Sequence, residues 1–107
     1  MNMWEVKAEK PSFVQSLRSL IVESGKSAQF VCRIESKTEA KVNWYRDKTL
    51  IKDSKEYKTT FTGSLVKLFI EKTSIEHSGM YTCEVINEYG REESSAELIV
   101  RGRYSVS

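Results

Sequence analysis

Hydrophobic and polar residues alternate with a period of two along much of the chain. In the strongest example, Ala28, Phe30, Cys32 and Ile34 fall on one side of the segment 28–35, and mostly polar residues fall on the other. A β-strand with one buried face produces this pattern, because successive side chains point to opposite faces of a sheet. The pattern therefore predicts a half-buried strand in this segment.

The same alternation recurs along the rest of the chain, between turn signals such as Thr62-Gly63-Ser64. The inward positions are Val42 and Trp44, then Val66, Leu68 and Ile70, then Tyr81, Cys83 and Val85, and finally Ala96, Leu98 and Val100. We expect the last two groups to form a hairpin around residues 87–90. No stretch keeps an apolar stripe at helical spacing for three turns, so the sequence predicts an all-β fold, typical of an antiparallel sandwich.

The N-terminal part of the domain is predicted to form an edge strand. Pro11 is compatible only with the start or edge of a strand, because its nitrogen has no proton to donate. Leu20 and Val22 alternate just before a turn signal at residues 23–25. Residues 1–10 and 102–107 show neither pattern nor turn signals, so we interpret them as linkers that flank one domain at 11–101.

Composition narrows the classes of partner. The 107 residues are 39% hydrophobic and 30% charged, which is typical of a soluble globular domain. The 17 basic and 15 acidic side chains give a formal net charge of +2, which provides little attraction for nucleic acid or acidic membranes. Apolar runs stay far below the roughly 20 residues of a membrane helix. We therefore expect no nucleic-acid or membrane partner.

Two features of the sequence bear on the cellular compartment of the protein. The first seven residues carry charge and contain no apolar segment of the kind that a secretory signal requires. No Asn-x-Ser/Thr glycosylation acceptor occurs in the chain. These features favour a cytoplasmic protein, with a fragment of an extracellular precursor as the alternative.

Two cysteines and two aromatic residues form a recognisable constellation. Cys32 and Cys83 lie too far apart for a compact metal site or a redox Cys-x-x-Cys motif. With Trp44 and the run Ser78-Gly79-Met80-Tyr81-Thr82-Cys83, they resemble the immunoglobulin signature of Cys, Trp and Tyr-x-Cys. The resemblance implies that the cysteines face each other across two sheets, that Trp44 packs on them, and that the Tyr81 hydroxyl ties a corner. Core packing of free thiols and a disulfide both remain open.

Further motifs are similar to those of the intermediate set (I-set) of this superfamily. They are Pro11-Ser12-Phe13, Glu23-Ser24-Gly25 and Asn87-x-x-Gly90. Modules of this kind are repeated in titin, twitchin, obscurin and myosin-binding proteins of muscle. The resemblance implies an immunoglobulin-like Greek-key antiparallel sandwich. His77 departs from the usual Asp, and Thr73 stands where relatives often have an apolar residue, so we expect altered electrostatics and looser packing at that end.

Catalysis has no support in the sequence. His77 is the only histidine, and neither a Ser/His/Asp set, a metal site nor a Gly-rich phosphate loop can be assembled around it. We therefore expect no enzyme activity, no cofactor, no metal and no small-molecule substrate. His77 is interpreted as a turn residue.

Protein binding is expected at sheet edges or loops. Edge strands carry unpaired backbone groups that a partner strand can complete, and we place these edges at residues 12–22 and 91–100. The candidate binding residues are Arg18, Tyr89, Arg91, Glu92, Glu93 and Glu97. Trp4, outside the sandwich, is either a contact with a neighbouring domain or a feature of the chain end. The basic cluster Lys48, Lys52, Lys55 and Lys58 is interspersed with acidic residues and is interpreted as a solvated face.

Three functions fit these features. The first is a non-catalytic module of a large sarcomeric muscle protein, acting as a structural spacer and docking surface for other proteins or neighbouring immunoglobulin domains. The second is an extracellular adhesion or matrix module. The third is a regulatory module that docks on a kinase or myosin.

Overall fold

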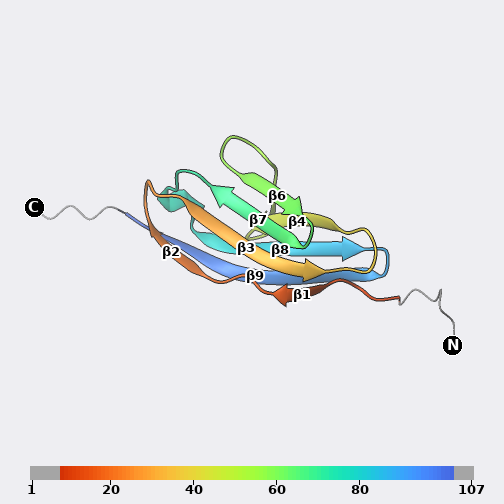
Figure 1. The fold of residues 1–107 in the computed structure, drawn as a ribbon. Coiled ribbons are helices and arrows are strands. Elements are labelled where there is room, and N and C mark those ends of the chain that lie inside the picture. Colours follow the sequence, from red (N-terminus) through yellow and green to blue (C-terminus); the bar gives the residue numbers. More distant parts are fainter. Residues whose placement is uncertain (1–7, 103–107) are drawn as a thin grey trace, which may run out of the picture.

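Two β-sheets pack face to face in the computed structural model of the chain, which describes residues 8–102 (Figure 1). One sheet has four strands in the order β1-β3-β7-β6, and the other has five in the order β2-β9-β8-β4-β5. The strands are β1 (Ser12–Gln15), β2 (Leu20–Glu23), β3 (Ala28–Glu35), β4 (Lys41–Arg46), β5 (Thr49–Ile51), β6 (Lys58–Thr62), β7 (Leu65–Ile70), β8 (Gly79–Asn87) and β9 (Gly90–Arg101). A short 3-10 helix, η1 (Ile75–His77), connects β7 to β8. The predicted all-β sandwich is confirmed.

Period-two alternation identified the strands that build the core. The buried faces of β3, β7, β8 and β9 meet between the sheets, as the alternation of their inward residues requires. The core residues are Leu17, Ala28, Phe30, Cys32, Ile34, Trp44, Val66, Leu68, Ile70, Tyr81, Cys83, Val85, Ala96, Leu98 and Val100. β5 and β6 were not predicted from the sequence, because neither has a strongly buried face: every residue in them is exposed or half-buried.

The single N-terminal strand expected over residues 12–22 is wrong: this segment forms two strands in different sheets. β1 pairs antiparallel with β3, and β2 pairs parallel with β9. Between them the chain crosses from one sheet to the other without reversing direction, with Leu17 buried at the crossing. The sandwich is therefore not wholly antiparallel.

The expectation that the last strand is an edge also needs correction. β9 lies between β8 and β2, so it is an interior strand of the five-stranded sheet. However, β2 pairs only with Leu98–Arg101, whereas β8 pairs with Gly90–Leu98. Residues 90–97 of β9 therefore lack a strand partner on one side, and only this half resembles an edge.

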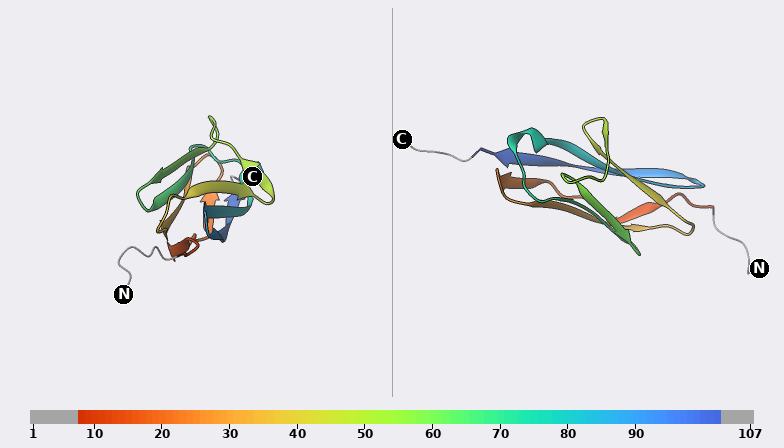
Figure 2. Two further views of the ribbon diagram at one scale, coloured as in Figure 1. Left: turned by 90° about the vertical axis from the view of Figure 1, so that its right-hand side faces the viewer. Right: turned by 90° about the horizontal axis from the view of Figure 1, so that it is seen from above.

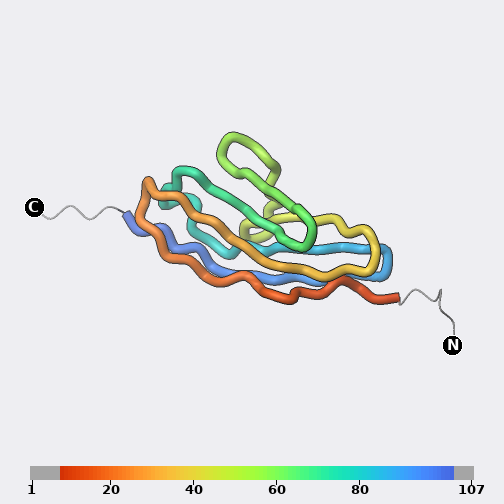
Figure 3. The backbone as a smooth tube through the Cα atoms, viewed as in Figure 1, coloured from red at the N-terminus to blue at the C-terminus, as the bar shows by residue number. Residues whose placement is uncertain are grey.

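The described chain enters and leaves at opposite ends of the sandwich. Figure 2 and the tube in Figure 3 show β1 beginning at the end where the β8–β9 hairpin lies, and β9 finishing at the other end. At this second end Thr73 is buried, and its hydroxyl donates to the carbonyl of Lys26 over 2.7 Å. The corner that we expected to be looser is thus held by hydrogen bonds in place of apolar packing.

Candidate functional site

The relative position of the two sheets is fixed by an aromatic cluster in the core. Trp44 on β4 is 3% exposed, and its ring centroid lies 6.4 Å from that of Phe30 on β3. Phe30 also packs on Tyr81 of β8, with centroids 5.0 Å apart. Offset contacts at these distances are the favourable arrangement for aromatic rings. The cluster joins both sheets, so it fixes the position of one sheet relative to the other.

Cys32 and Cys83 are free thiols that face each other in this core. Both are fully buried, and their Sγ atoms are 3.7 Å apart. The hydrogen bond with Cys32, together with burial, raises the pKa of the Cys83 thiol. Because the thiolate is the reactive form, Cys83 is inert as a nucleophile in the folded chain.

Tyr81 ties the η1 corner to β8. Its hydroxyl donates to the carbonyl of His77 over 2.6 Å, and burial is the largest cause that raises the pKa of this phenol. This contact matches the role that the immunoglobulin resemblance implies for Tyr81. The hydroxyl stays protonated and holds the start of β8 in place.

His77 is buried and locally satisfied. Its Nδ1 atom accepts a hydrogen bond from the Ser74 amide over 2.9 Å, and its Nε2 atom lies 3.5 Å from the Glu56 carboxylate. An Nδ1 that accepts from an amide carries no proton, so Nε2 carries it and faces Glu56. Arg46 donates to the carbonyl of Glu76 in the same turn. These contacts surround His77, which stands where the I-set pattern usually has Asp.

In the half of β9 without a strand partner, every second amide faces away from β8, and the crossing segment contacts this half where the Leu17 amide donates to Ser94 Oγ over 2.9 Å. On the side facing β2, the Glu97 amide donates to Ser19 Oγ over 3.1 Å. On the opposite side, the Val100 amide donates to Ser78 Oγ over 2.9 Å. Amides alternate between the two sides of a strand, so those of Arg91, Glu93 and Ser95 share the side of Glu97. We call the stretch from Arg91 to Ser95 the open edge of β9.

A buried carboxylate lies on the outer face of the same sheet. Glu84 on β8 is only 4% exposed although its position faces outward. Its Oε1 atom accepts hydrogen bonds from Asn43 Nδ2 and from the Tyr45 hydroxyl, each over 3.2 Å. Its Oε2 atom accepts one from Arg91, also over 3.2 Å. Four bonded side chains from β4, β8 and β9 therefore form a polar network beside the open edge.

This network affects the ionisation of Tyr45. Partial desolvation and the adjacent Glu84 carboxylate raise the pKa of the Tyr45 phenol, so it remains a hydrogen-bond donor at neutral pH.

The sequence did not predict the burial of Glu84, because alternation alone classes it as an exposed outward residue. No sequence signal could have found it, because its cover depends on strand register: Glu84 lies opposite Asn43 on one side and Glu93 on the other.

The hairpin between β8 and β9 packs against the N-terminal segment. The buried Asn87 donates through Nδ2 to the Glu9 carbonyl over 2.9 Å, and its Oδ1 accepts from the Tyr89 amide over 2.8 Å. Lys10 forms an ion pair with Glu92 at 2.9 Å. Tyr89 itself is 41% exposed at the tip. The hairpin therefore fixes the path by which the chain enters the domain.

The candidate binding residues do not form one cluster. Arg91, Glu93 and Glu97 lie on the outer face of the five-stranded sheet, whereas Glu92 turns toward Lys10. Tyr89 lies at the hairpin, and Arg18 is exposed on the segment between β1 and β2. Trp4 lies outside the described residues. The open edge thus brings together Arg91 and Glu93, and leaves the other residues apart.

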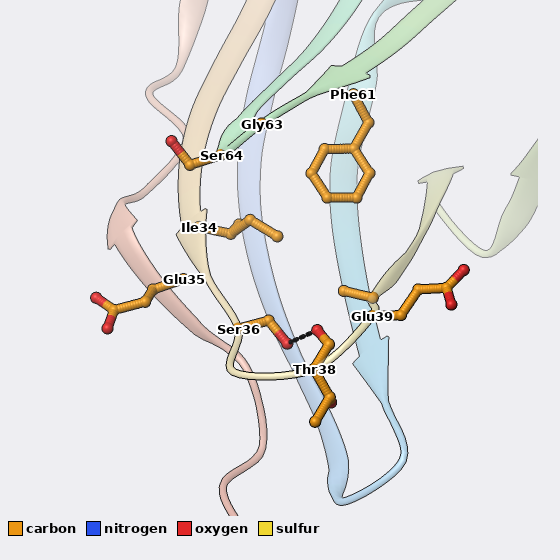
Figure 4. Close-up of a pocket in the computed structure, with 9 residues that line it drawn as sticks. Ile34, Glu35, Ser36, Thr38, Glu39, Phe61, Gly63 and Ser64 are labelled. Carbon is orange, nitrogen blue, oxygen red and sulfur yellow. Dashed lines mark hydrogen bonds between the residues drawn. The ribbon is translucent and has the colours of Figure 1, made fainter.

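A shallow hollow of about 440 Å³ lies near the end of the sandwich that carries the β8–β9 hairpin (Figure 4). Phe61 and Ile34 point into it from β6 and β3, and Ser36 donates to the Thr38 carbonyl across its lower wall. Glu35 and Glu39 also line it but point outward on opposite sides (Figure 4), so they do not form the close pair of carboxylates that acid–base catalysis needs. Within residues 8–102 no group of three or more His, Cys, Asp or Glu side chains could hold a metal ion. No helix in that range is long and apolar enough to cross a membrane.

Comparisons with known proteins find that the chain is similar to segments of much longer proteins. It is 33% identical to myopalladin of Mus musculus over 105 residues, which cover 91% of this chain and 8% of that protein. It is 32% identical to the muscle M-line assembly protein unc-89 of Caenorhabditis elegans over 97 residues, covering 91% of this chain and 1% of that protein. The chain therefore spans a small part of each relative.

A solved structure and a family model agree with these relatives. The titin domains z1z2 in complex with telethonin match with a TM-score of 0.85 and 33% identity, covering 90% of this chain and 49% of that one. The family model of the immunoglobulin I-set domain matches residues 11–100. The chain belongs to the immunoglobulin I-set family.

Proposed function

We propose that this chain is a non-catalytic module of a large sarcomeric protein, where it acts as a spacer and docks a protein partner on the open edge of β9. The observation that carries the proposal is the row of amides of Arg91, Glu93 and Ser95, which no strand among residues 8–102 covers, although the Glu93 amide donates to the Glu92 carboxylate. A partner strand can pair with such a row, and alternate side chains then set its specificity. The relatives, which are large muscle proteins, support the sarcomeric location.

The arrangement of the chain ends supports the role of a spacer. Residues 8 and 102 lie at opposite ends of the sandwich, so modules joined in series would extend end to end (Figure 1). The contacts of Asn87 with Glu9 and of Lys10 with Glu92 would fix the direction in which the chain enters. The titin pair solved with telethonin is an example of this fold with a protein partner, and it supports docking as part of the function.

The open edge can be tested with Ser95→Pro. Proline removes the amide of residue 95, which by strand alternation faces away from β8, so the β8–β9 ladder should survive. Ser95→Ala is the matched control, because it removes the hydroxyl that contacts Thr82 at 2.7 Å but keeps the amide. The assay is the localisation of the chain, fused to a fluorescent protein, in cultured cardiomyocytes.

We expect periodic, striated localisation for the wild-type chain and the alanine variant, and diffuse fluorescence for the proline variant. Circular dichroism of the purified proteins should show that all three are folded. Striated localisation of a folded Ser95→Pro chain would exclude the open edge as the docking surface. Diffuse fluorescence of the wild-type chain would refute the sarcomeric role itself.

A further inference from the structure

The two outer faces of the sandwich differ in charge. Outward positions on the five-stranded sheet carry both signs, including Arg91, Glu93 and Glu97 on β9 alone. On the four-stranded sheet, outward positions of β3, β6 and β7 carry Arg33, Lys58 and Lys67. The one acidic outward residue of these strands, Glu35, lies at the end of β3 and pairs with Lys37 at 3.9 Å. This face is therefore cationic.

The three cations form a diagonal line across the sheet. Arg33 on β3 is opposite Leu65, Lys67 on β7 is opposite Val31, and Lys58 on β6 is opposite Phe69. From Arg33 to Lys67, and from Lys67 to Lys58, each step moves one strand across and two residues along. Strand spacing and rise make each step about 8 Å. We call this line of three residues the basic stripe.

None of the three cations of the stripe forms an ion pair among the described residues. Neither Lys58 nor Lys67 forms an ion pair, and Arg33 donates only to the Ser64 hydroxyl over 3.2 Å. Glu35 lies two residues from Arg33 but pairs with Lys37. Asp53 accepts from the Thr59 amide over 2.9 Å beside Lys58. Neither carboxylate forms an ion pair with the stripe, so its three like charges contribute little electrostatic stability to the fold. The aliphatic stems of these residues can cover apolar neighbours, but this leaves the charges themselves unmatched.

Each cation also lies beside a half-buried apolar side chain. Val31, Leu65 and Phe69 are all partly accessible on the same face. Nucleic acid or a lipid surface would match the charge through phosphate groups alone, whereas a protein segment can match both the charge and the apolar surface. Along an extended chain, every second side chain recurs at about 6.8 Å, close to the step of the stripe.

We propose that the basic stripe is a second docking surface, which binds an extended protein segment that presents acidic residues at every second position, on the one face turned toward the stripe. This surface lies on the sheet opposite β9, so it is independent of the open edge. Complementary charge would speed association and make it sensitive to salt. The aliphatic stems of the segment's acidic side chains would cover Val31, Leu65 and Phe69, which the phosphate groups of a nucleic acid or lipid surface cannot do.

The test uses a fluorescein-labelled peptide of six Glu-Val repeats, with binding followed by fluorescence anisotropy at low and physiological salt. We expect the triple variant Arg33→Gln, Lys58→Gln and Lys67→Gln to weaken binding by about tenfold or more, since each exposed charge contributes modestly. The matched control is Lys48→Gln, Lys52→Gln and Lys55→Gln, which removes the same charge from exposed loop positions. We expect its affinity to stay within about twofold of the wild type.

Two further measurements keep the test decisive. Lys58→Arg with Lys67→Arg preserves the charge and should bind like the wild type, which separates loss of charge from loss of packing. A hexaglutamate peptide should bind more weakly than the Glu-Val peptide, because only three of its six carboxylates share one face of an extended chain, whereas all six do in the Glu-Val peptide. Equal weakening by both glutamine triples, or tighter binding to a single-stranded oligonucleotide or to phosphatidylserine vesicles, would overturn the proposal.

Discussion

Trp44 offers the sharpest test of how the core is built. Its side chain is 3% exposed, contacts Phe30 at 6.4 Å between centroids, and joins β4 to the opposite sheet. A buried aromatic side chain removes about 150–250 Å² from water. At about 25 cal/mol per Å², this corresponds to about 4–6 kcal/mol as an upper estimate. Trp44→Ala should therefore lower the free energy of unfolding by about 3–5 kcal/mol.

The indole nitrogen adds a second, distinguishing expectation. Trp44 Nε1 is buried and has no hydrogen-bond partner among residues 8–102, which is unfavourable for a polar atom. Trp44→Phe deletes this unpaired donor and leaves a smaller cavity, so the loss should be only about 1–2 kcal/mol.

Urea unfolding followed by far-ultraviolet circular dichroism measures both variants without depending on tryptophan fluorescence. The slope with urea should stay unchanged, because both native states remain equally compact. A loss below about 1 kcal/mol for Trp44→Ala would refute the role of Trp44 in joining the two sheets.

Three further predictions concern the other buried and paired groups. Tyr81→Phe should lower the free energy of unfolding by about 1–3 kcal/mol in urea titration, because it leaves the His77 carbonyl without its donor; an unchanged midpoint would contradict this. Thiol titration under reducing conditions should find Cys32 and Cys83 unreactive in the folded chain and both reactive after denaturation, whereas a disulfide recovered from native tissue would favour the extracellular alternative. The hydrogen bond and charge of Lys10 lower the pKa of Glu92 in the folded chain, so this pair contributes stability above the unfolded pKa that is lost as pH falls through the folded one. Glu92→Gln should therefore lose less stability than the wild type between about pH 5 and pH 3 in thermal melts, and identical pH profiles would argue against the pair.

The core strands were predictable because their sequence pattern reports burial directly. In β3, β7 and β8 every second residue is apolar, and these residues meet between the sheets. β6 was not predicted because it pairs only with β7 at the edge of its sheet and buries no residue strongly. The crossing at Leu17 was also missed, since alternation states which face a residue occupies but not which sheet its strand joins.

The interaction surfaces depend on register, which the sequence does not reveal. Glu84 is covered by Asn43, Tyr45 and Arg91 only because three strands align at that row. The open edge of β9 exists only because β2 ends its pairing at Leu98. Local patterns could nominate Arg91 and Glu93 as charged strand residues, but not the free backbone beside them.

Amide hydrogen exchange, read residue by residue by NMR, tests the open edge of β9 most directly. By strand alternation, the amides of Glu92, Ser94 and Ala96 face β8 and should exchange slowly. Those of Arg91 and Ser95 should exchange far faster, because no strand covers them. Equal protection of both sets in the free chain would contradict the account, since it would mean that this side of β9 is already paired and closed to a partner.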